Sequence, residues 1–413
     1  MGRLLAAGAC AAALLLTVSA CQGDSEAEDA GLTFLVAETA ERPAAYWQEA
    51  VDRVAAAEGG LDIALTVIPL GTDPTGHVRQ MLSTGGALPD IMAGVSPQGL
   101  GTPELLYGWQ PEETVRFRLP YAGTVAGQIY RLPGTGEALP LVYYNKDLLA
   151  EAGIDEVPGT FADLLKAADA LLDAGVKPFA VGGVEAATLL WSTTIATDVY
   201  RVSPGWMQHR RLGHVHFCDE EFRASAEKVA DLADYISLSD AGGDASFLAG
   251  EGAMYPATSR FALAADAQPP GFEIGAFTWP TDDGSTVVPA YLGGGLSVSA
   301  TAKDLAAARR FALAFSLDTG NLDHAATVEG LFPAVTDYTP PEGSALYQRG
   351  YELYAEALET GTLMPAVGRE DGDDGVPSAA VGDWQTAAAQ LLGGLAEPGE
   401  VCATLDDGYR PAG

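Results

Sequence analysis

The sequence predicts a mixed α/β fold made of two units. Near its start, short apolar strands alternate with helices, which is typical of a parallel sheet covered by helices. A second alternation begins at about residue 141. The sequence contains no internal repeat and no long linker between the two stretches. We therefore expect two α/β units that share several chain crossings, rather than separate domains that follow one another.

The first unit is predicted from apolar runs and from helical spacing of apolar residues. Its expected elements, in order, are a strand at 33–36, a helix at 44–57, a strand at 63–68, a helix at 77–83 and a strand that begins within 88–92. The pair Gly85-Gly86 should end the second helix, because glycine readily adopts the left-handed conformation that follows a helix.

The second unit is predicted in the same way, with helix-capping residues as additional signals. Asn145 and Thr160 each precede a helical stretch, where a side-chain oxygen can accept hydrogen bonds from the first backbone amides. The expected elements are a strand at 141–144, helices at 147–152 and 161–174, a strand at 179–181, a buried helix at 187–199, a helix at 222–236 capped by Cys218 or Asp219, a strand near 253–255, an extended run at 272–279, a strand at 296–299, and helices at 304–317, 344–357 and 378–395.

The charge balance excludes several functions. The 413 residues include 22 Lys and Arg against 56 Asp and Glu, so the formal net charge is −34. Such a surface repels phosphate, and we expect no nucleic-acid partner. We expect neither a cofactor nor a metal, since only 5 His and 4 Cys are present. A zinc site at His214, His216 and Cys218 is the weak alternative, because zinc usually takes three or four such ligands.

The first residues predict export. Arg3 precedes an apolar run at 4–16 that is too short to span a membrane, as expected of a secretory signal. Ser19 and Ala20 directly before Cys21 resemble the bacterial lipobox, which implies a signal peptide at 1–20 and a lipid on the Cys21 sulfur. Residues 21–31 would then form the lipidated start and a flexible acidic tether. Ordinary secretion with an unmodified cysteine is the alternative.

Export also concerns the cysteines that remain. Cys218 and Cys402 form an even pair outside the cytoplasm, so they can join in a disulfide. The alternative is two separate buried thiols.

Four stretches of sequence carry a family resemblance. They are YRLP at 130–133 followed by LVYYNKDLL at 141–149, FLAGEGAM at 247–254, YLGGGLSV at 291–298, and Trp384 ahead of LLGG at 391–394. In this order they resemble an extracellular solute-binding protein of the sugar-binding type (family 1), the receptor component of an ABC importer. The resemblance covers the chain from about Thr33 to its end.

The resemblance implies a type II periplasmic-binding-protein-like fold, with two α/β lobes, hinge crossings and a ligand cleft between the lobes. An N-lobe would comprise 32–136 plus 291–333, and a C-lobe 137–290 plus 334–413. The protein would capture an extracellular mono- or oligosaccharide by hinge closure and deliver it to the permease without altering it. We expect a monomer, lipid-anchored on the extracellular face of the cell membrane.

A sugar presents hydroxyls at its rim and an apolar face, so its receptor needs carboxylates or amides together with aromatic rings. The resemblance points to thirteen ligand residues: Glu38, Thr39, Ser96, Gln98, Glu185, Trp191, Tyr255, Ser259, Arg260, Trp279, Tyr291, Gly294 and Trp384. For each tryptophan the alternative is core packing, and for Glu38 and Glu185 it is a solvated loop. The family often has a Trp near position 260, and Arg260 in its place permits an anionic or polar ligand group. The glycines at 293–295 serve either as a hinge or as a place where ligand meets backbone.

Two other functions stay open. A secreted carbohydrate-active hydrolase would need a pair of carboxylates about 5 to 10 Å apart across a cleft. Alternatively, the same receptor fold binds a peptide, a polyol or another polar solute.

Overall fold

The computed structural model describes residues 31–236, 242–292, 294–366, 372–373, 375–376 and 380–409. The predicted signal peptide, Cys21 and all but the last residue of the predicted tether lie outside the described residues. In the part that is described, no helix combines the length and the apolar character needed to cross a membrane.

The first lobe is built around a four-stranded sheet with the order β11-β3-β1-β2. Strand β1 runs parallel to β2 and β3, and β11 lies antiparallel to β3. Its elements are β1 Leu32–Ala37, α1 Ala44–Ala57, β2 Ile63–Ile68, α2 Pro74–Ser83, β3 Ile91–Ala93, α3 Pro111–Thr114, the short helix η1 Pro120–Gly123, β4 Thr124–Val125, β5 Gln128–Ile129, β11 Leu296–Val298, α11 Leu305–Leu317 and α12 Thr319–Thr327.

Strand β1 is buried on both faces, as expected of a strand inside a parallel sheet. Phe34 points to the side of α1 and α11, where its ring packs against Phe315 with centroids 5.4 Å apart. Leu35 points to the other side and joins a cluster with Val78 of α2. The alternation of side chains along β1 therefore holds helices on both faces of the sheet.

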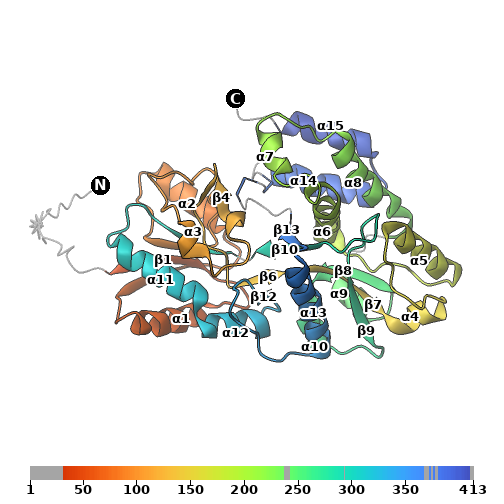
Figure 1. The fold of residues 1–413 in the computed structure, drawn as a ribbon, viewed down its shortest axis with the longest axis horizontal. Helices are drawn as coiled ribbons and strands as arrows, with labels where there is room; N and C mark the ends of the chain where they lie inside the picture. The colour runs from red at the N-terminus through yellow and green to blue at the C-terminus, as the bar shows by residue number, and fades with distance from the viewer. Residues whose placement is uncertain are drawn as a thin grey trace, which may run out of the picture.

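The second lobe surrounds a three-stranded sheet with the order β8-β7-β9, and both pairings are antiparallel. Figure 1 shows it beside the first lobe, with α5, α8 and α15 on its outer side. Its elements are β7 Pro140–Asn145, α4 Lys146–Glu151, α5 Phe161–Asp173, α6 Gly183–Ile195, the π-helical turn η2 Ala196–Tyr200, α7 Trp206–Arg211, α8 Glu220–Asp231, η3 Ala233–Tyr235, α9 Gly243–Leu248, β8 Met254–Thr258, α10 Phe261–Ala267, β9 Ile274–Thr278, α14 Val381–Leu392 and α15 Pro398–Gly408.

Between the lobes lies a central sheet with the order β12-β6-β10-β13, accompanied by α13 (Figure 1). Its elements are β6 Gly136–Ala138, β10 Val288–Leu292, β12 Phe332–Pro333, α13 Ala345–Thr360 and β13 Leu363–Pro365. The predicted lobe boundaries at 136/137, 290/291 and 333/334 fall within β6, within β10 and at the end of β12. That placement of the boundaries stays a prediction.

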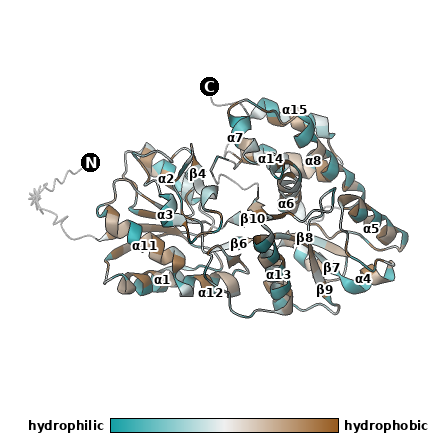
Figure 2. Ribbon diagram, viewed as in Figure 1, coloured by the Kyte–Doolittle hydropathy of each residue, from teal (hydrophilic) through white to brown (hydrophobic). Residues whose placement is uncertain are grey.

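The helices on the outside are amphipathic. In α5, Phe161, Leu164 and Leu171 are buried, and the side chain of Lys166 is mostly exposed. Figure 2 shows hydrophilic residues on α5 and α15 where they meet solvent. The sheets thereby keep an apolar covering while the surface carries the negative charge.

Several predicted elements agree closely with the structure, and the differences have local causes. The helix at 44–57 and the strand at 63–68 have the predicted bounds. Helix α2 begins at Pro74, three residues before the predicted start, because Asp73 accepts hydrogen bonds from the amides of Thr75 and Gly76. Thr160 and Asn145 cap their helices as predicted. Asp219 precedes α8, but its carboxylate accepts instead from the amide of His216.

Other predictions were wrong. The stretch 179–181 forms only a one-residue bridge from Phe179 to Met254, so it is no strand. The sequence analysis also missed α7, α9, α10, α12 and α15. Of these, α7, α9 and α10 have only 6, 6 and 7 residues, too few to show several turns of apolar periodicity.

The two cysteines among the described residues are free thiols, with Cys218 exposed and Cys402 buried. Both lie near Asp406, whose carboxylate accepts from the Cys218 amide at 3.1 Å. The disulfide between them stays a prediction.

The central sheet contains a buried acid. Glu137 of β6 is fully buried, and neither of its carboxylate oxygens has a hydrogen-bond partner among the described residues. Burial raises the pKa of Glu137 to about 8, although the nearby Tyr354 hydroxyl and Arg118 guanidinium lower it in part. The folded protein therefore holds Glu137 mainly protonated at neutral pH.

We predict that Glu137 makes stability depend on pH. Because its pKa is about 8 in the folded state and 4.5 ordinarily, its favourable contribution is complete below about pH 4.5 and is lost as pH rises to about 8. The loss should be about 4 to 5 kcal/mol. Urea unfolding of the wild type and of Glu137→Gln at about pH 5 and about pH 9 measures the difference. Equal pH dependence in the two proteins would contradict the assignment.

Candidate functional site

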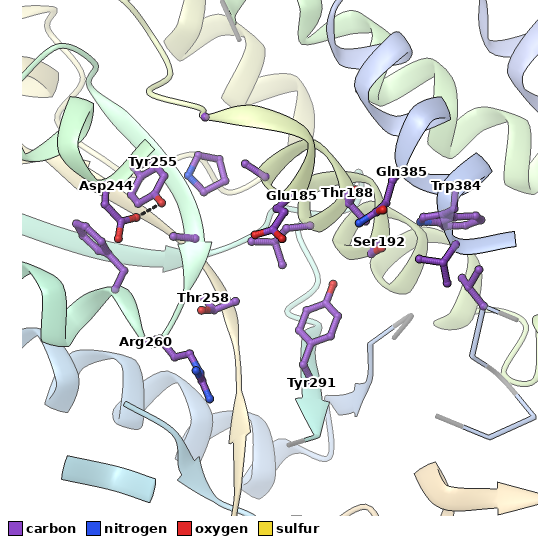
Figure 3. Close-up of a pocket in the computed structure, with 18 residues that line it drawn as sticks. Glu185, Thr188, Ser192, Asp244, Tyr255, Thr258, Arg260, Tyr291, Trp384 and Gln385 are labelled. Atoms are coloured by element: carbon purple, nitrogen blue, oxygen red, sulfur yellow. Dashed lines mark hydrogen bonds between the residues drawn. The ribbon is translucent and has the colours of Figure 1, made fainter. Parts of the chain in front are cut away.

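A first cavity of about 610 Å³ opens between α6, β8, β10 and α14 (Figure 3). The side chains that line it are mixed polar and aromatic. They belong to Glu185, Thr188, Leu189, Ser192, Asp244, Tyr255, Thr258, Arg260, Phe261, Tyr291, Val376, Val381, Trp384 and Gln385, together with several small residues. Its size is typical of a small-molecule binding site.

Helix α6 presents a polar stripe to this cavity. Glu185, Thr188 and Ser192 are spaced by three and four residues, so they share one helix face. Trp191, one turn along from Thr188, lies on the adjoining face, where it is fully buried and stacks on Trp384 of α14 with ring centroids 4.7 Å apart. Trp384 lies between this core and the cavity. The core stack thus fixes the aromatic ring that reaches the cavity wall.

The end of β8 supplies further polar groups. The Tyr255 hydroxyl donates a hydrogen bond to the Asp244 carboxylate, as Figure 3 shows. Burial, and then this hydrogen bond, raise the pKa of Tyr255, which therefore stays protonated as a donor. Thr258 follows on the same strand and presents its hydroxyl beside Arg260 (Figure 3).

Tyr291 of β10 brings a buried hydroxyl to the same cavity. Figure 3 shows its side chain rising toward Glu185 and Ser192. Its oxygen has no partner that meets hydrogen-bond geometry within the described ranges. Burial raises the pKa of Tyr291 to about 12, against a smaller lowering by the nearby hydroxyls of Thr193 and Ser192. A buried polar group without a full partner costs free energy, which a solute that bonds to it would recover.

A second cavity of about 400 Å³ lies on the side of the first lobe, and Arg260 lines both cavities. Glu38, Thr39 and Gly294 line the second cavity. Glu38 also accepts from the Ala44 amide at 3.0 Å, and Thr39 accepts from the Arg42 amide at 3.0 Å, so both help to start α1.

One buried carboxylate joins the two lobes where the cavities meet. Glu329 accepts from Arg42, with Oε1 2.6 Å from Nη2, and from Arg260, with Oε2 3.2 Å from Nη2. Arg42 follows β1 of the first lobe, and Arg260 follows β8 of the second lobe. The side chains of Glu329 and Arg42 are 6% and 14% exposed, whereas that of Arg260 is 44% exposed. Arg260 is therefore the accessible member of this Arg42–Glu329–Arg260 triad.

The structure brings eight of the thirteen predicted residues to these two cavities. Glu185, Tyr255, Tyr291 and Trp384 line the first, Glu38, Thr39 and Gly294 line the second, and Arg260 lines both. The roles of these eight residues in ligand binding stay predictions.

The other five predicted residues line neither cavity. Trp191 and Trp279 pack in the core of the second lobe, as core packing is the usual place of a tryptophan. Ser259 is buried where its hydroxyl donates to the Gly330 carbonyl at 3.0 Å. Ser96 and Gln98 are buried in the loop after β3, and the Gln98 amide bonds to the Gly372 carbonyl. Their positions correct their selection as cavity residues.

Sequence reasoning missed several cavity residues. The spacing of Thr188 and Ser192 after Glu185 could have revealed the polar face of α6. Asp244, Gln385 and Glu329 carried no such signal, because tertiary contacts alone bring them to the cavities.

One of the glycines after β10 packs closely against another backbone segment, and the choice between their two predicted roles, hinge or ligand contact, stays a prediction. A Cβ on Gly295 would lie 1.7 Å from the Leu132 carbonyl oxygen, so the backbone approaches closely there. Gly293 lies outside the described residues.

The lining of the cavities suits the binding of a polar solute. Nowhere in the described ranges do three or more His, Cys, Asp or Glu side chains gather as a metal site would require. The cavity walls instead offer hydroxyls, carboxylates, a guanidinium and aromatic rings, which together suit a polar solute with apolar faces.

Two α/β lobes joined by a central sheet, with polar cavities beside the crossing strands, define a solute-binding protein. The chain belongs to the family of bacterial extracellular solute-binding proteins, whose sequence model matches residues 37–316. No curated protein matches the sequence.

Solved structures share this fold at low sequence identity. A chitin oligosaccharide binding protein is 20% identical, with a TM-score of 0.72 over 92% of this chain and 98% of its own. A family 1 extracellular solute-binding protein from Bifidobacterium longum subsp. infantis is 16% identical, with a TM-score of 0.70 over 91% and 98%. Apo RafE from Streptococcus pneumoniae is 18% identical, with a TM-score of 0.67 over 92% and 97%. These structures confirm the predicted type II fold.

We predict that Tyr291→Phe separates solute binding from stability. Removing a buried hydroxyl that has no full partner should leave the melting temperature of the solute-free protein unchanged or raised. If the hydroxyl bonds to solute, the same change should weaken solute binding about 3- to 10-fold. Thermal melting and titration calorimetry measure the two effects, with Tyr144→Phe, outside both cavities, as the control. Lower stability with unchanged affinity would contradict this role.

Proposed function

We propose that this protein is the receptor of an ABC importer that captures a carbohydrate outside the membrane and delivers it unaltered to the permease. The observation that carries the proposal is the first cavity, where the aromatic residues Trp384 and Tyr291 lie beside hydroxyls of α6 and β8 and the carboxylates of Glu185 and Asp244. A sugar needs both kinds of group, because its ring has apolar faces and a hydroxyl rim.

The relatives by fold support the carbohydrate class. They include a chitin oligosaccharide binding protein, RafE in complex with raffinose, and the receptor AcbH, which has an exclusive preference for β-D-galactopyranose. These proteins include receptors for a single sugar and for longer sugars, so the fold alone does not decide the length of the ligand. We propose that the eight cavity residues named above contact the sugar in this chain.

The proposed mechanism is closure of the two lobes about the crossing strands of the central sheet. A ligand that contacts both lobes binds the closed form more tightly than the open form, and so shifts the population toward closure. The permease would then recognise the closed form. No bond in the sugar changes during this cycle.

We further propose that the protein acts as a monomer, held at the extracellular face of the membrane by acyl chains on Cys21. The net charge of −34 keeps the folded body away from anionic headgroups. The acidic segment after Cys21 would serve as the tether between lipid and lobes.

A direct test compares binding with turnover. The purified protein should raise its melting temperature with at least one member of a sugar and polyol panel, because a ligand that binds only the folded state stabilises it. Chromatography after long incubation should recover that sugar intact. Released smaller sugars would instead support the hydrolase alternative. Stabilisation by a peptide or a polyol alone would support a receptor for another solute.

The lipid anchor has its own test. Cells fed labelled palmitate should label the wild-type protein, and Cys21→Ser should abolish the label and release the protein into the medium. Cys218→Ser, at an exposed thiol, is the matched control and should keep both label and membrane association. Labelling of the Cys21→Ser protein would contradict the anchor.

A further inference from the structure

The two cavities meet at a single side chain. Arg260 is a wall residue of the first cavity, of about 610 Å³, and of the second, of about 400 Å³. Each volume by itself is within the range of about 300 to 1,000 Å³ that small-molecule sites occupy. A solute that fills both cavities is therefore larger than one that fills either, and it must pass Arg260.

The Arg260 guanidinium is held by Glu329 and still has N–H groups available to a solute. Among the described residues it donates only to Glu329, and its side chain is 44% exposed. Its remaining N–H groups are free to donate to oxygen acceptors on a solute. Figure 3 places the guanidinium at the edge of the first cavity, beyond Thr258.

The support behind Arg260 is rigid. Arg42 fixes Glu329 from the first lobe and also donates to the Thr135 hydroxyl at 2.9 Å. Gly330 has a φ of +66°, and a Cβ there would lie 2.9 Å from the Arg260 Cα, so the backbone segments pack too closely for any side chain. Glu329 is thus a positioning residue, because it sets the direction of the Arg260 fork.

The two cavities differ in their chemistry. The first offers the aromatic residues Tyr255, Phe261, Tyr291 and Trp384, whereas the second has one aromatic residue, Trp47, and combines apolar residues such as Leu70 and Leu331 with polar ones such as Glu38, Thr39 and Thr72. A sugar ring can rest against several aromatic side chains in the first cavity, and in the second it can meet Trp47 while its hydroxyls bond to the carboxylates and hydroxyls there.

We propose that the ligand is an oligosaccharide that spans both cavities, and that Arg260 determines this specificity by binding the oxygen atoms between consecutive sugar units. This inference rests on the proposed carbohydrate receptor function. It adds that the ligand has more than one sugar unit and that Arg260 determines the specificity for this length.

The test is a calorimetric titration with three ligand series, each from the monosaccharide to the hexasaccharide: α-1,4-linked glucose, β-1,4-linked N-acetylglucosamine and β-1,4-linked xylose. In the series that binds, affinity should rise at least about 10-fold above the monosaccharide and then level off once both cavities are filled. Arg260→Met should weaken the longer sugars roughly 10- to 100-fold, because it removes charged donors. Arg260→Lys should restore part of that loss.

A blocking variant tests the second cavity. Thr72 is exposed on its wall, so Thr72→Trp should weaken the longer sugars and leave the shortest bound sugar unaffected. Thr102→Trp, an exposed site of the first lobe outside both cavities, is the matched control and should change nothing. If the monosaccharide binds as tightly as the longer sugars, or if Thr72→Trp and Arg260→Met leave length dependence intact, this inference alone is overturned. If no sugar of any series or of the wider panel binds, the result contradicts the proposed function and therefore also this inference.

Discussion

The site depends on the buried carboxylate of Glu329, which holds a guanidinium from each lobe. Taking charges out of water is costly, and the pairing of Glu329 with Arg42 and Arg260 offsets that cost only while all three remain together. The hydroxyl of neighbouring Ser259 fastens the same loop to β8 through the Gly330 carbonyl. The base of the cleft is therefore fixed by polar contacts, and the walls above it are left free to present side chains to a solute.

In the second lobe, the hydrophobic core and the wall of the first cavity share a side chain, that of Trp384. Trp384 reaches the cavity only because Trp191 stacks behind it and Phe222 packs against both rings. The polar face of α6 adjoins that same stack, because Trp191 follows Thr188 by three residues. Apolar packing consequently sets the orientation of the groups that a sugar would meet, and a change in this core would alter binding without touching the ligand.

Much of the fold could be predicted from sequence, whereas only part of the site could. The strands and long helices of the first lobe follow from apolar runs and spacing, and α4 and α5 of the second lobe follow from the caps Asn145 and Thr160, because these signals are local. Antiparallel pairing in the second lobe, and the short helices, depend on contacts between distant segments. The cavity residues divide in the same way. Tyr291 lies in a stretch that resembles the family and Tyr255 directly follows another, whereas Glu329 reaches the site from a loop with no signal of its own.

The order of the strands along the chain has a consequence for biogenesis. The first lobe starts at β1, yet it lacks β11 and α11 until the chain has passed residue 317, and the second lobe lacks α14 until residue 392. Neither half can complete its hydrophobic interior while the polypeptide is still emerging. Because such late, long-range pairing slows folding, we expect the chain to travel through the export machinery as an open coil and to acquire its shape only after nearly all of it has crossed.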